Sequence, residues 1–528
     1  MRSILMSNVA DKSAFVPEGD WLHEPGQSSG QGVGTPFLWG ATLLAGILRI
    51  YGLMSQSLWV DELLTWQTIR PDVGLCFSEQ IFDSIQGPLY LSVLWPLVRF
   101  LDPALMLRLP AAIAGIAAVP LFGLLVSRWW DRRAARLAVL LFALNPFLVW
   151  YSQEGRGYSF LILFLIAQAL VFSRMTERDP TYRGALFFAL FSACAALSNL
   201  SGLFLWLGMG LSALVFFRPR TKKAWSVWIL AFGLGFLLML PWLLKASGIW
   251  AVDRLIPGSG TGPVLRGDTT FTWLALPYSF FTFFFGNSLG PSLRELHQPD
   301  RIAVVRSYLP LLGLGALPVV IGLVAGLWRL PRRQYFLLLW VIVPVAILVF
   351  LAVRNFKPWN PRYVIVILPW VLALTGLGLS RLPHRMGFGL SSILVGLTLW
   401  SLGNYYWNGH YAKADVRDAV ALVEDQNLDA FPVLVPVITG VYRFYHEGPA
   451  EVLGTFDWGT LDAPGTADLF CNAKLAGVDE CFLVLGREWF FDPKGLLLPA
   501  LSSRGRLTLV EKLNGIKIYH WSRSALQG

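Results

Sequence analysis

Residues 309–353 read LPLLGLGALPVVIGLVAGLWRLPRRQYFLLLWVIVPVAILVFLAV, two apolar runs on either side of a short basic linker. Each run is close to the roughly 20 residues that a helix needs to cross a bilayer core of about 30 Å. The arginines of the linker are typical of cytoplasmic loops. The stretch therefore predicts two helices that cross a membrane and are joined on its cytoplasmic side.

Similar apolar stretches recur along most of the chain, and 55% of its 528 residues are hydrophobic while only 14% are charged. They lie near residues 36–55, 87–101, 104–127, 137–152, 159–173, 184–198, 202–217, 224–247, 307–327, 335–353, 362–380 and 388–403. Because several are short or fused, we expect about ten to thirteen transmembrane helices in a polytopic α-helical membrane protein.

The net charge of +10 comes from basic clusters between these stretches, as in SRWWDRRAAR, FRPRTKK and SRLPHR. Such clusters report membrane orientation, so no nucleic-acid partner is predicted. We expect a multi-pass protein of the inner (plasma) membrane, with residues 1–34 a disordered cytoplasmic tail and residues 35–403 the membrane module. The loops 56–86 and 248–306 then lie outside, the second with an interfacial amphipathic segment.

One conflict remains in this topology. Residues 87–127 look like two spans, yet an odd number is needed to place RWWDRRAAR inside. Either a segment there is re-entrant or that basic loop breaks the rule. Residues 404–528 contain charges, a helical repeat and strand-like runs, which predict an extracytoplasmic α/β domain.

Three polar motifs are expected to meet on the outer face. The first, WVDELLTW, places Asp61 and Glu62 between two tryptophans at the headgroup level, where a carboxylate can gain the basicity of a general base. The second contains Arg156 and Tyr158, and the third contains Lys357, Arg362 and Tyr363. Arginines on the outer side oppose the usual charge bias, so they are candidates to bind a lipid phosphate.

Each motif also has a purely structural interpretation: acids at a helix start, an ion pair of Glu154 with Arg156, and snorkelling anchors around residue 357. The sequence contains no nucleotide-binding, HExxH or GxSxG motif. The two acids and scattered histidines are too few to predict a metal, so no cofactor is predicted. Cys471 and Cys481 fall in the extracytoplasmic domain, where a disulfide could persist, and the sequence leaves that pairing open.

The order of SLWVDELLTW, GPLYLSVLW, LRLPAAIAGIAAVPLF, LNPFLVWYSQEGRGYSF and RYVIVILPWVLALTGLGL resembles a family of bacterial membrane glycosyltransferases. These enzymes are similar to protein O-mannosyltransferases and the lipid A aminoarabinose transferase (glycosyltransferase family 39-like) and have the GT-C architecture. The resemblance covers roughly residues 36–400.

The resemblance implies a polyprenyl-phosphate sugar as donor, an extracytoplasmic active site and inversion at the anomeric carbon. Asp61 would accept the proton of an acceptor hydroxyl and Glu62 would support it. Arg156, Arg362 and Tyr363 would contact the donor phosphate, with Tyr158 and Lys357 as neighbouring candidates. Membrane lipids are the surrounding partners, and the sugar and the acceptor are not specified.

This chain departs from the family at two positions. Gln86 stands where many relatives have a histidine before their PLYY-like segment, and Asn199 stands where others carry a THY-like motif. Mannose specificity is therefore not carried over. A transporter or flippase of lipid-linked saccharides is the main alternative, and a catalytically silent scaffold is a third.

Overall fold

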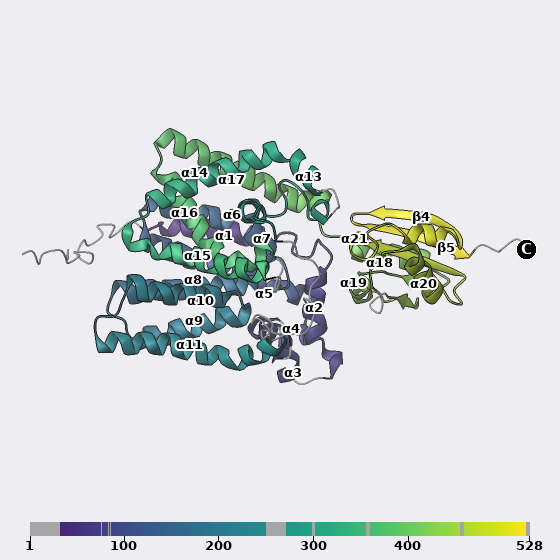
Figure 1. Ribbon diagram of the computed structural model, residues 1–528, viewed down its shortest axis with the longest axis horizontal. Coiled ribbons are helices and arrows are strands. Elements are labelled where there is room, and N and C mark those ends of the chain that lie inside the picture. Colours follow the sequence, from purple (N-terminus) through teal and green to yellow (C-terminus); the bar gives the residue numbers. More distant parts are fainter. Residues whose placement is uncertain are drawn as a thin grey trace, which may run out of the picture.

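The computed structural model describes residues 32–74, 77–82, 84, 86–249, 271–297, 301–354, 359–454 and 459–523. A bundle of long helices forms one part of the molecule, and a small domain with a sheet sits at one end of it (Figure 1). The predicted Lys357, most of the tail 1–34 and parts of the loop 248–306 lie outside the described residues.

Seven of the described helices are long and apolar enough to cross a membrane. They are α5 (Pro103–Trp129), α8 (Tyr158–Glu177), α11 (Lys222–Ile249), α14 (Leu309–Trp328), α15 (Phe336–Val353, after η4, Arg332–Gln334), α16 (Leu368–Arg381, after η5, Pro361–Ile367) and α17 (His384–Trp407). An eighth span is the pair α6 (Arg132–Leu144) and α7 (Pro146–Ser152), bent by 48° at Asn145-Pro146. The polytopic helical fold is confirmed.

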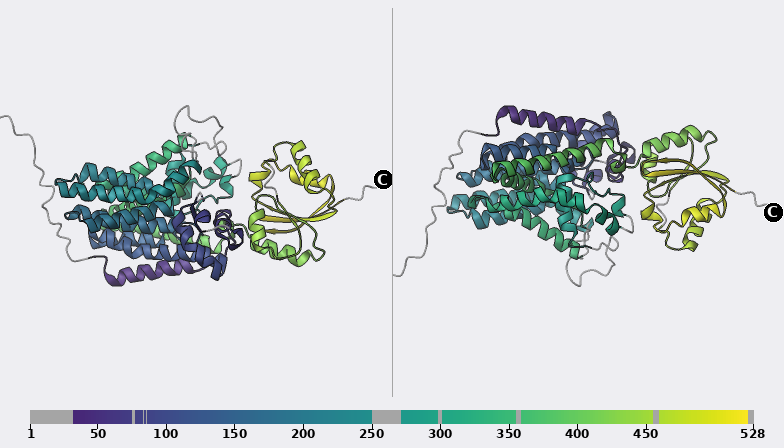
Figure 2. Two further views of the ribbon diagram at one scale, coloured as in Figure 1. Left: turned by 90° about the horizontal axis from the view of Figure 1, so that it is seen from below. Right: turned by 90° about the horizontal axis from the view of Figure 1, so that it is seen from above.

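Three shorter apolar helices run alongside these spans (Figures 1 and 2): α1 (Thr35–Ile50), α9 (Tyr182–Ser198) and α10 (Gly202–Phe216). The described residues thus contain seven candidate spans, or eight with the bent pair, which is fewer than the ten to thirteen predicted. The three shorter helices have 15 to 17 residues each. The arginine-rich connections α5–α6, α8–α9, α10–α11, α14–α15 and α16–α17 then all fall at the bundle end away from the small domain.

The conflict at residues 87–127 is resolved by unequal helices. α4 (Pro88–Phe100) has only 13 residues and contains Pro96, whereas α5 has 27. α4 packs with α2 (Val60–Ile69) and α3 (Phe77–Phe82) at the end of the bundle that faces the small domain (Figure 1). Of α4 and α5, only α5 is long and apolar enough to cross a membrane, which gives the odd number of spans that a cytoplasmic basic loop requires.

The loop that follows α11 returns to the bundle in its described part. α12 (Ala275–Phe285) buries Phe283, Phe284 and Phe285, and the Phe283 carbonyl accepts a hydrogen bond from Asn145 Nδ2 at 2.7 Å. The predicted aromatic segment is therefore packed against the bend between α6 and α7. Two short helices, η3 (Glu295–His297) and α13 (Arg301–Ser307), lead into α14.

The terminal domain is α/β, as predicted. A five-stranded sheet has the order β2-β1-β3-β5-β4, parallel across β2-β1-β3 and antiparallel across β3-β5-β4. The strands are β1 (Val433–Leu434), β2 (Val452–Leu453), β3 (Glu480–Gly486), β4 (Gly505–Leu513) and β5 (Ile516–Arg523). The helices are η6 (Gly409–Tyr411), α18 (Val416–Gln426), α19 (Thr439–Tyr445), α20 (Pro464–Lys474), α21 (Glu488–Phe491) and α22 (Leu497–Ser502). α17 continues to Trp407, past the boundary expected at residue 403.

Alternate residues of β3 face two apolar layers, as the period of two of a strand requires. Phe482 and Val484 pack with α18 and α19, while Leu483 and Leu485 pack with α20 and α22. Figure 2 shows helices on both faces of the sheet.

The disulfide between Cys471 and Cys481, which the sequence left open, is not formed in the structure, and both residues are free thiols buried in the second layer. Burial raises the pKa of the Cys471 thiol to about 11 and that of Cys481 to about 12. Both are therefore protonated core residues with little thiolate character at neutral pH.

Candidate active site

Asp61 and Glu62 occupy the first turn of α2, where the partial positive charge of a helix start favours acids. Glu62 Oε2 accepts from the backbone N–H of Trp59 at 2.8 Å, which caps the helix. The two neighbours nevertheless point into different surroundings.

The Glu62 side chain is fully buried and saturated with donors. Arg108 of α5 donates to both carboxylate oxygens, from Nε at 2.7 Å and from NH2 at 2.9 Å. Lys413 Nζ adds a contact of 3.1 Å, and the backbone N–H of Gly155 adds one of 2.9 Å. Burial acts to raise the pKa of the Glu62 carboxyl, but Lys413 and Arg108 outweigh it and hold the pKa well below its usual range. Glu62 therefore joins α2, α5, the α7–α8 connection and the terminal segment.

Asp61 is the more accessible acid of the pair, with 18% of its side chain exposed. Its Oδ2 forms an ion pair with Arg362 of η5, whose side chain is 24% exposed. Arg156 donates from NH1 to the Asp61 backbone carbonyl at 3.2 Å. Burial acts to raise the pKa of the Asp61 carboxyl, but Arg362 and Arg156 reverse the effect and lower it. Asp61 is thus an ionised carboxylate beside two arginines.

The predicted tyrosines lie beside these arginines. The Arg362 guanidinium carbon is 5.3 Å from the centre of the Tyr363 ring, and its NH2 donates to the Tyr363 hydroxyl at 3.4 Å. Tyr158 is buried at the start of α8, edge-on to Tyr151 with ring centres 4.7 Å apart. The structure therefore brings together Asp61, Glu62, Arg156, Tyr158, Arg362 and Tyr363.

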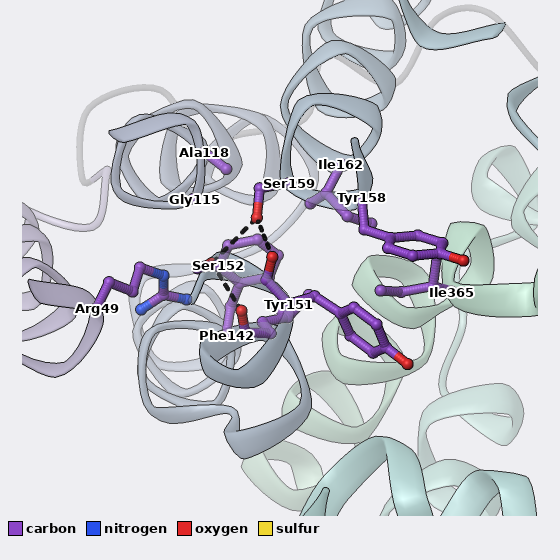
Figure 3. A pocket seen from close by; sticks show the side chains of 11 residues that line it. Arg49, Gly115, Ala118, Phe142, Tyr151, Ser152, Tyr158, Ser159, Ile162 and Ile365 are labelled. Atoms are coloured by element: carbon purple, nitrogen blue, oxygen red, sulfur yellow. Dashed lines mark hydrogen bonds between the residues drawn. The ribbon is translucent and has the colours of Figure 1, made fainter. Parts of the chain in front are cut away.

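A small cavity lies behind the two tyrosines (Figure 3), lined also by Arg49, Ser152 and Ser159. Its volume of about 10 Å³ is room for about one water molecule. Arg49 donates to the Ala143 carbonyl at 3.0 Å, and its buried Nε has no hydrogen-bond partner within the described chain. A water in the cavity would satisfy this donor.

Gln153 and Glu154, in the same motif as Arg156, are structural. Gln153 donates to the Arg49 and Tyr51 carbonyls at 3.1 and 2.7 Å and accepts from the Tyr405 hydroxyl at 2.7 Å. Glu154 accepts from the Trp150 indole at 2.9 Å and is 3% exposed. Burial raises the pKa of the Glu154 carboxyl. The ion pair of Glu154 with Arg156 is not formed.

Three residues at the site, Arg108, Lys413 and Arg487, were missed at the sequence level, and Gln86 was noted only as a departure from the family pattern. Arg108 had a signal, because an isolated arginine in an apolar run indicates a buried polar role. No such sequence signal marked Lys413 or Arg487. Oriented to satisfy its neighbours, the Gln86 amide donates to the Thr65 hydroxyl at 3.0 Å and accepts from Arg156 at 3.3 Å. Gln86 thus holds Arg156 in place.

Two of the three acids at the site are already committed to donors within the protein. Glu62 already accepts from five donors, and one oxygen of Glu154 is taken by an indole. Among the described residues, no group of three or more His, Cys, Asp or Glu side chains is placed to hold a metal ion.

Comparisons with known proteins find the fold and not the sequence family. No family model and no curated protein sequence matches the chain. Among solved structures, ArnT from Cupriavidus metallidurans in the apo state is similar, with a TM-score of 0.56 and 14% identity over 92% of this chain and 98% of that one. The same protein bound to undecaprenyl phosphate gives 0.54, with the same identity and coverage. The oligosaccharyltransferase from Archaeoglobus fulgidus tethered with an acceptor peptide gives 0.53 and 14% identity over 93% and 74%.

These similarities and the helix arrangement define the class. The chain is a multi-pass membrane protein with the GT-C fold, as the sequence resemblance implied.

Proposed function

We propose that this protein is an integral membrane glycosyltransferase that transfers a sugar from a polyprenyl-phosphate donor to an acceptor hydroxyl on the extracytoplasmic face. The fold it shares with ArnT, which binds undecaprenyl phosphate, supports this proposal. The sugar is a hexose or a pentose, and the acceptor is a cell-envelope lipid, glycan or protein.

The observation that carries the proposal is the contrast between Asp61 and its neighbours. Of the three acids at the site, Glu62 and Glu154 are buried and already bonded, while Asp61 is partly exposed and is held by arginines. A base must reach the acceptor proton and a phosphate needs cationic donors, so only Asp61 with Arg362 and Arg156 offers both. Glu62 then acts as a positioning residue, through α2.

In the proposed reaction, the acceptor oxygen attacks the anomeric carbon while the bond from that carbon to the phosphate oxygen breaks. The hydroxyl proton passes to Asp61, and the bonding electron pair leaves with the polyprenyl phosphate. The leaving group is a phosphate monoester dianion, which Arg362 and Arg156 would stabilise with help from Tyr363 and Tyr158. The ion pair with Arg362 lowers the basicity of Asp61. Because the donor phosphate would compete for Arg362, donor binding would weaken this ion pair and make Asp61 a better base.

The distribution of basic residues supports the proposed orientation. The arginine-rich connections lie at the bundle end opposite the site, which supports an extracytoplasmic site and terminal domain in the inner membrane. A transporter of lipid-linked saccharides would usually place its polar groups near mid-membrane. Here they gather at one end of the bundle, beside the small domain, which favours the transferase.

The test uses full-length protein in nanodiscs with labelled undecaprenyl-phosphate hexoses and pentoses and an envelope extract as acceptor. Asp61→Asn should lower sugar transfer at least a hundredfold and leave the melting temperature close to that of the wild type. Asp72→Asn is the matched control, because Asp72 is an exposed acid of the same outer segment. Full activity in Asp61→Asn would refute the assigned base.

A further inference from the structure

Arg487 of the terminal domain has an unusual backbone. It follows β3 with φ 57°, and Val437, just beyond the neighbouring parallel strand β1, has φ 64°. Bulky side chains avoid this left-handed region, and such conformations cost about 1–3 kcal/mol each and cluster at functional sites. Both residues lie where the carboxyl ends of parallel strands form the usual ligand crevice of an open α/β sheet.

The Arg487 side chain faces the membrane module. Its guanidinium carbon lies 4.8 Å from the centre of the Trp59 ring, and Asp61 and Arg362 are the charged groups that act on it. Its Nε is buried and has no hydrogen-bond partner among the residues the structure describes. In Figure 1, α21, which begins just after Arg487, lies at the edge of the terminal domain that faces the helix bundle.

The local charges leave this arginine without a counter-ion. Glu62 is matched by Arg108 and Lys413, and Asp61 by Arg362. Neither Arg156 nor Arg487 forms an ion pair with a described acid, and both lie within the electrostatic reach of Asp61. The site can therefore accept negative charge at two places, one on the membrane helices and one on the terminal domain.

We propose that Arg487 binds an anionic group of the acceptor, so that the acceptor carries a phosphate or a carboxylate near the hydroxyl that receives the sugar. The inference rests on the proposed function and names the acceptor class for the same site. The donor comes from the membrane, where Arg156 and Arg362 extend from helix ends. Arg487 approaches the site from the terminal domain, through its contact with Trp59, and we place the acceptor on that side.

A cavity of about 50 Å³ lies beside the Arg487 backbone and is lined by Gly486, Glu488, Val437 and Asp492, among others. Arg487 itself does not line it, and its two acidic residues do not suit an anion. The anionic group would therefore be bound by the Arg487 side chain beside Trp59 and not in this cavity. The flat face of Trp59 also suits stacking with a sugar or with the bound cation–anion pair.

The experiment separates envelope extract by anion-exchange chromatography and supplies each fraction to full-length protein in nanodiscs with labelled undecaprenyl-phosphate sugars. We expect the acceptor in the retained, anionic fractions. Arg487→Met should lower transfer more than tenfold, mainly through KM for the acceptor fraction, and Arg487→Lys should restore part of it. Arg506→Met is the control, because Arg506 is an exposed arginine of the same domain.

A second measurement, of lipid binding, tells whether Arg487 acts on the acceptor or on the donor. Binding of labelled undecaprenyl phosphate should stay within about twofold of wild type in Arg487→Met. Equal loss of lipid binding in Arg487→Met and Arg362→Met would overturn the inference, as would an acceptor that does not bind the exchanger. Phosphatase treatment that abolishes acceptor activity identifies a phosphate, and resistance identifies a carboxylate; either result supports the inference. A wild type that transfers no sugar would instead refute the proposed function.

Discussion

Lys413, in the segment that follows the last membrane helix, donates to Glu62 at the start of the proposed catalytic helix, with Nζ 3.1 Å from Oε2. The two residues are 351 positions apart in the chain. Arg417 extends the same junction by donating to the Met54 and Ser55 carbonyls at 3.2 Å. The terminal domain is thus connected by buried charge to the helix that carries Asp61.

Glu62→Gln should destabilise the protein. The change leaves Arg108 and Lys413 buried without a carboxylate, and breaking a buried ion pair typically costs about 3–5 kcal/mol. Thermal unfolding in detergent should show a lower melting temperature than in Asp61→Asn. Because the folded pKa of Glu62 is depressed, its stabilisation is present above its unfolded pKa and is lost as the pH falls. The wild type should therefore lose more stability on acidification than Glu62→Gln, and a stable but inactive Glu62→Gln would make Glu62 catalytic.

Arg362→Met should weaken donor binding. The variant loses the guanidinium that faces both Asp61 and the expected phosphate, so the Kd for undecaprenyl phosphate should rise more than tenfold. Arg362→Lys should recover only part of the affinity, because an ammonium cannot form two parallel hydrogen bonds. Arg354→Met, an exposed arginine at the end of α15, is the matched control. Unchanged lipid binding in Arg362→Met would contradict the phosphate role.

The membrane orientation can be tested by cysteine labelling in intact cells, in a background without native cysteines. Ser503→Cys in the terminal domain should react with a membrane-impermeant maleimide, because the residue is exposed there. Arg385→Cys, an exposed position in the first turn of α17, should react only after permeabilisation. The reverse pattern would invert the topology and place the site in the cytoplasm.

The fold and the motifs that meet at the site could be predicted from the sequence. The roles of single residues could not. Apolar runs and basic loops identify spans locally, so the bundle was accessible from composition. The sequence did not predict that Glu62 is buried and structural while Asp61 is partly exposed. That difference depends on Arg108, Lys413 and Arg362, which come from distant segments. Arg487 gave no sequence signal at all, since its position follows from the sheet and from domain docking.

The two cysteines illustrate the same limit, since burial is not visible in their spacing. Cys471 and Cys481 should both be alkylated only after denaturation, and reductant should not change the melting temperature. Mass spectrometry of the alkylated protein with and without prior reduction measures this directly. A mass increase for two further alkyl groups after reduction would show that the two cysteines form a disulfide.

The pH dependence should reveal whether donor binding changes the base. In the free protein, Arg362 and Arg156 outweigh burial and lower the pKa of Asp61, so the carboxylate persists through the neutral range. When the donor phosphate takes Arg362, this stabilisation of the carboxylate is lost while burial remains, and the pKa of Asp61 rises. Because kcat/KM reports the free enzyme and kcat the substrate complex, the acidic limb of kcat should lie at higher pH. Arg362→Met should move the limb of kcat/KM upward toward that of kcat. Rates measured between pH 4 and 8 test both statements, and coincident limbs in the wild type would show that Arg362 stays paired with Asp61 when the donor binds.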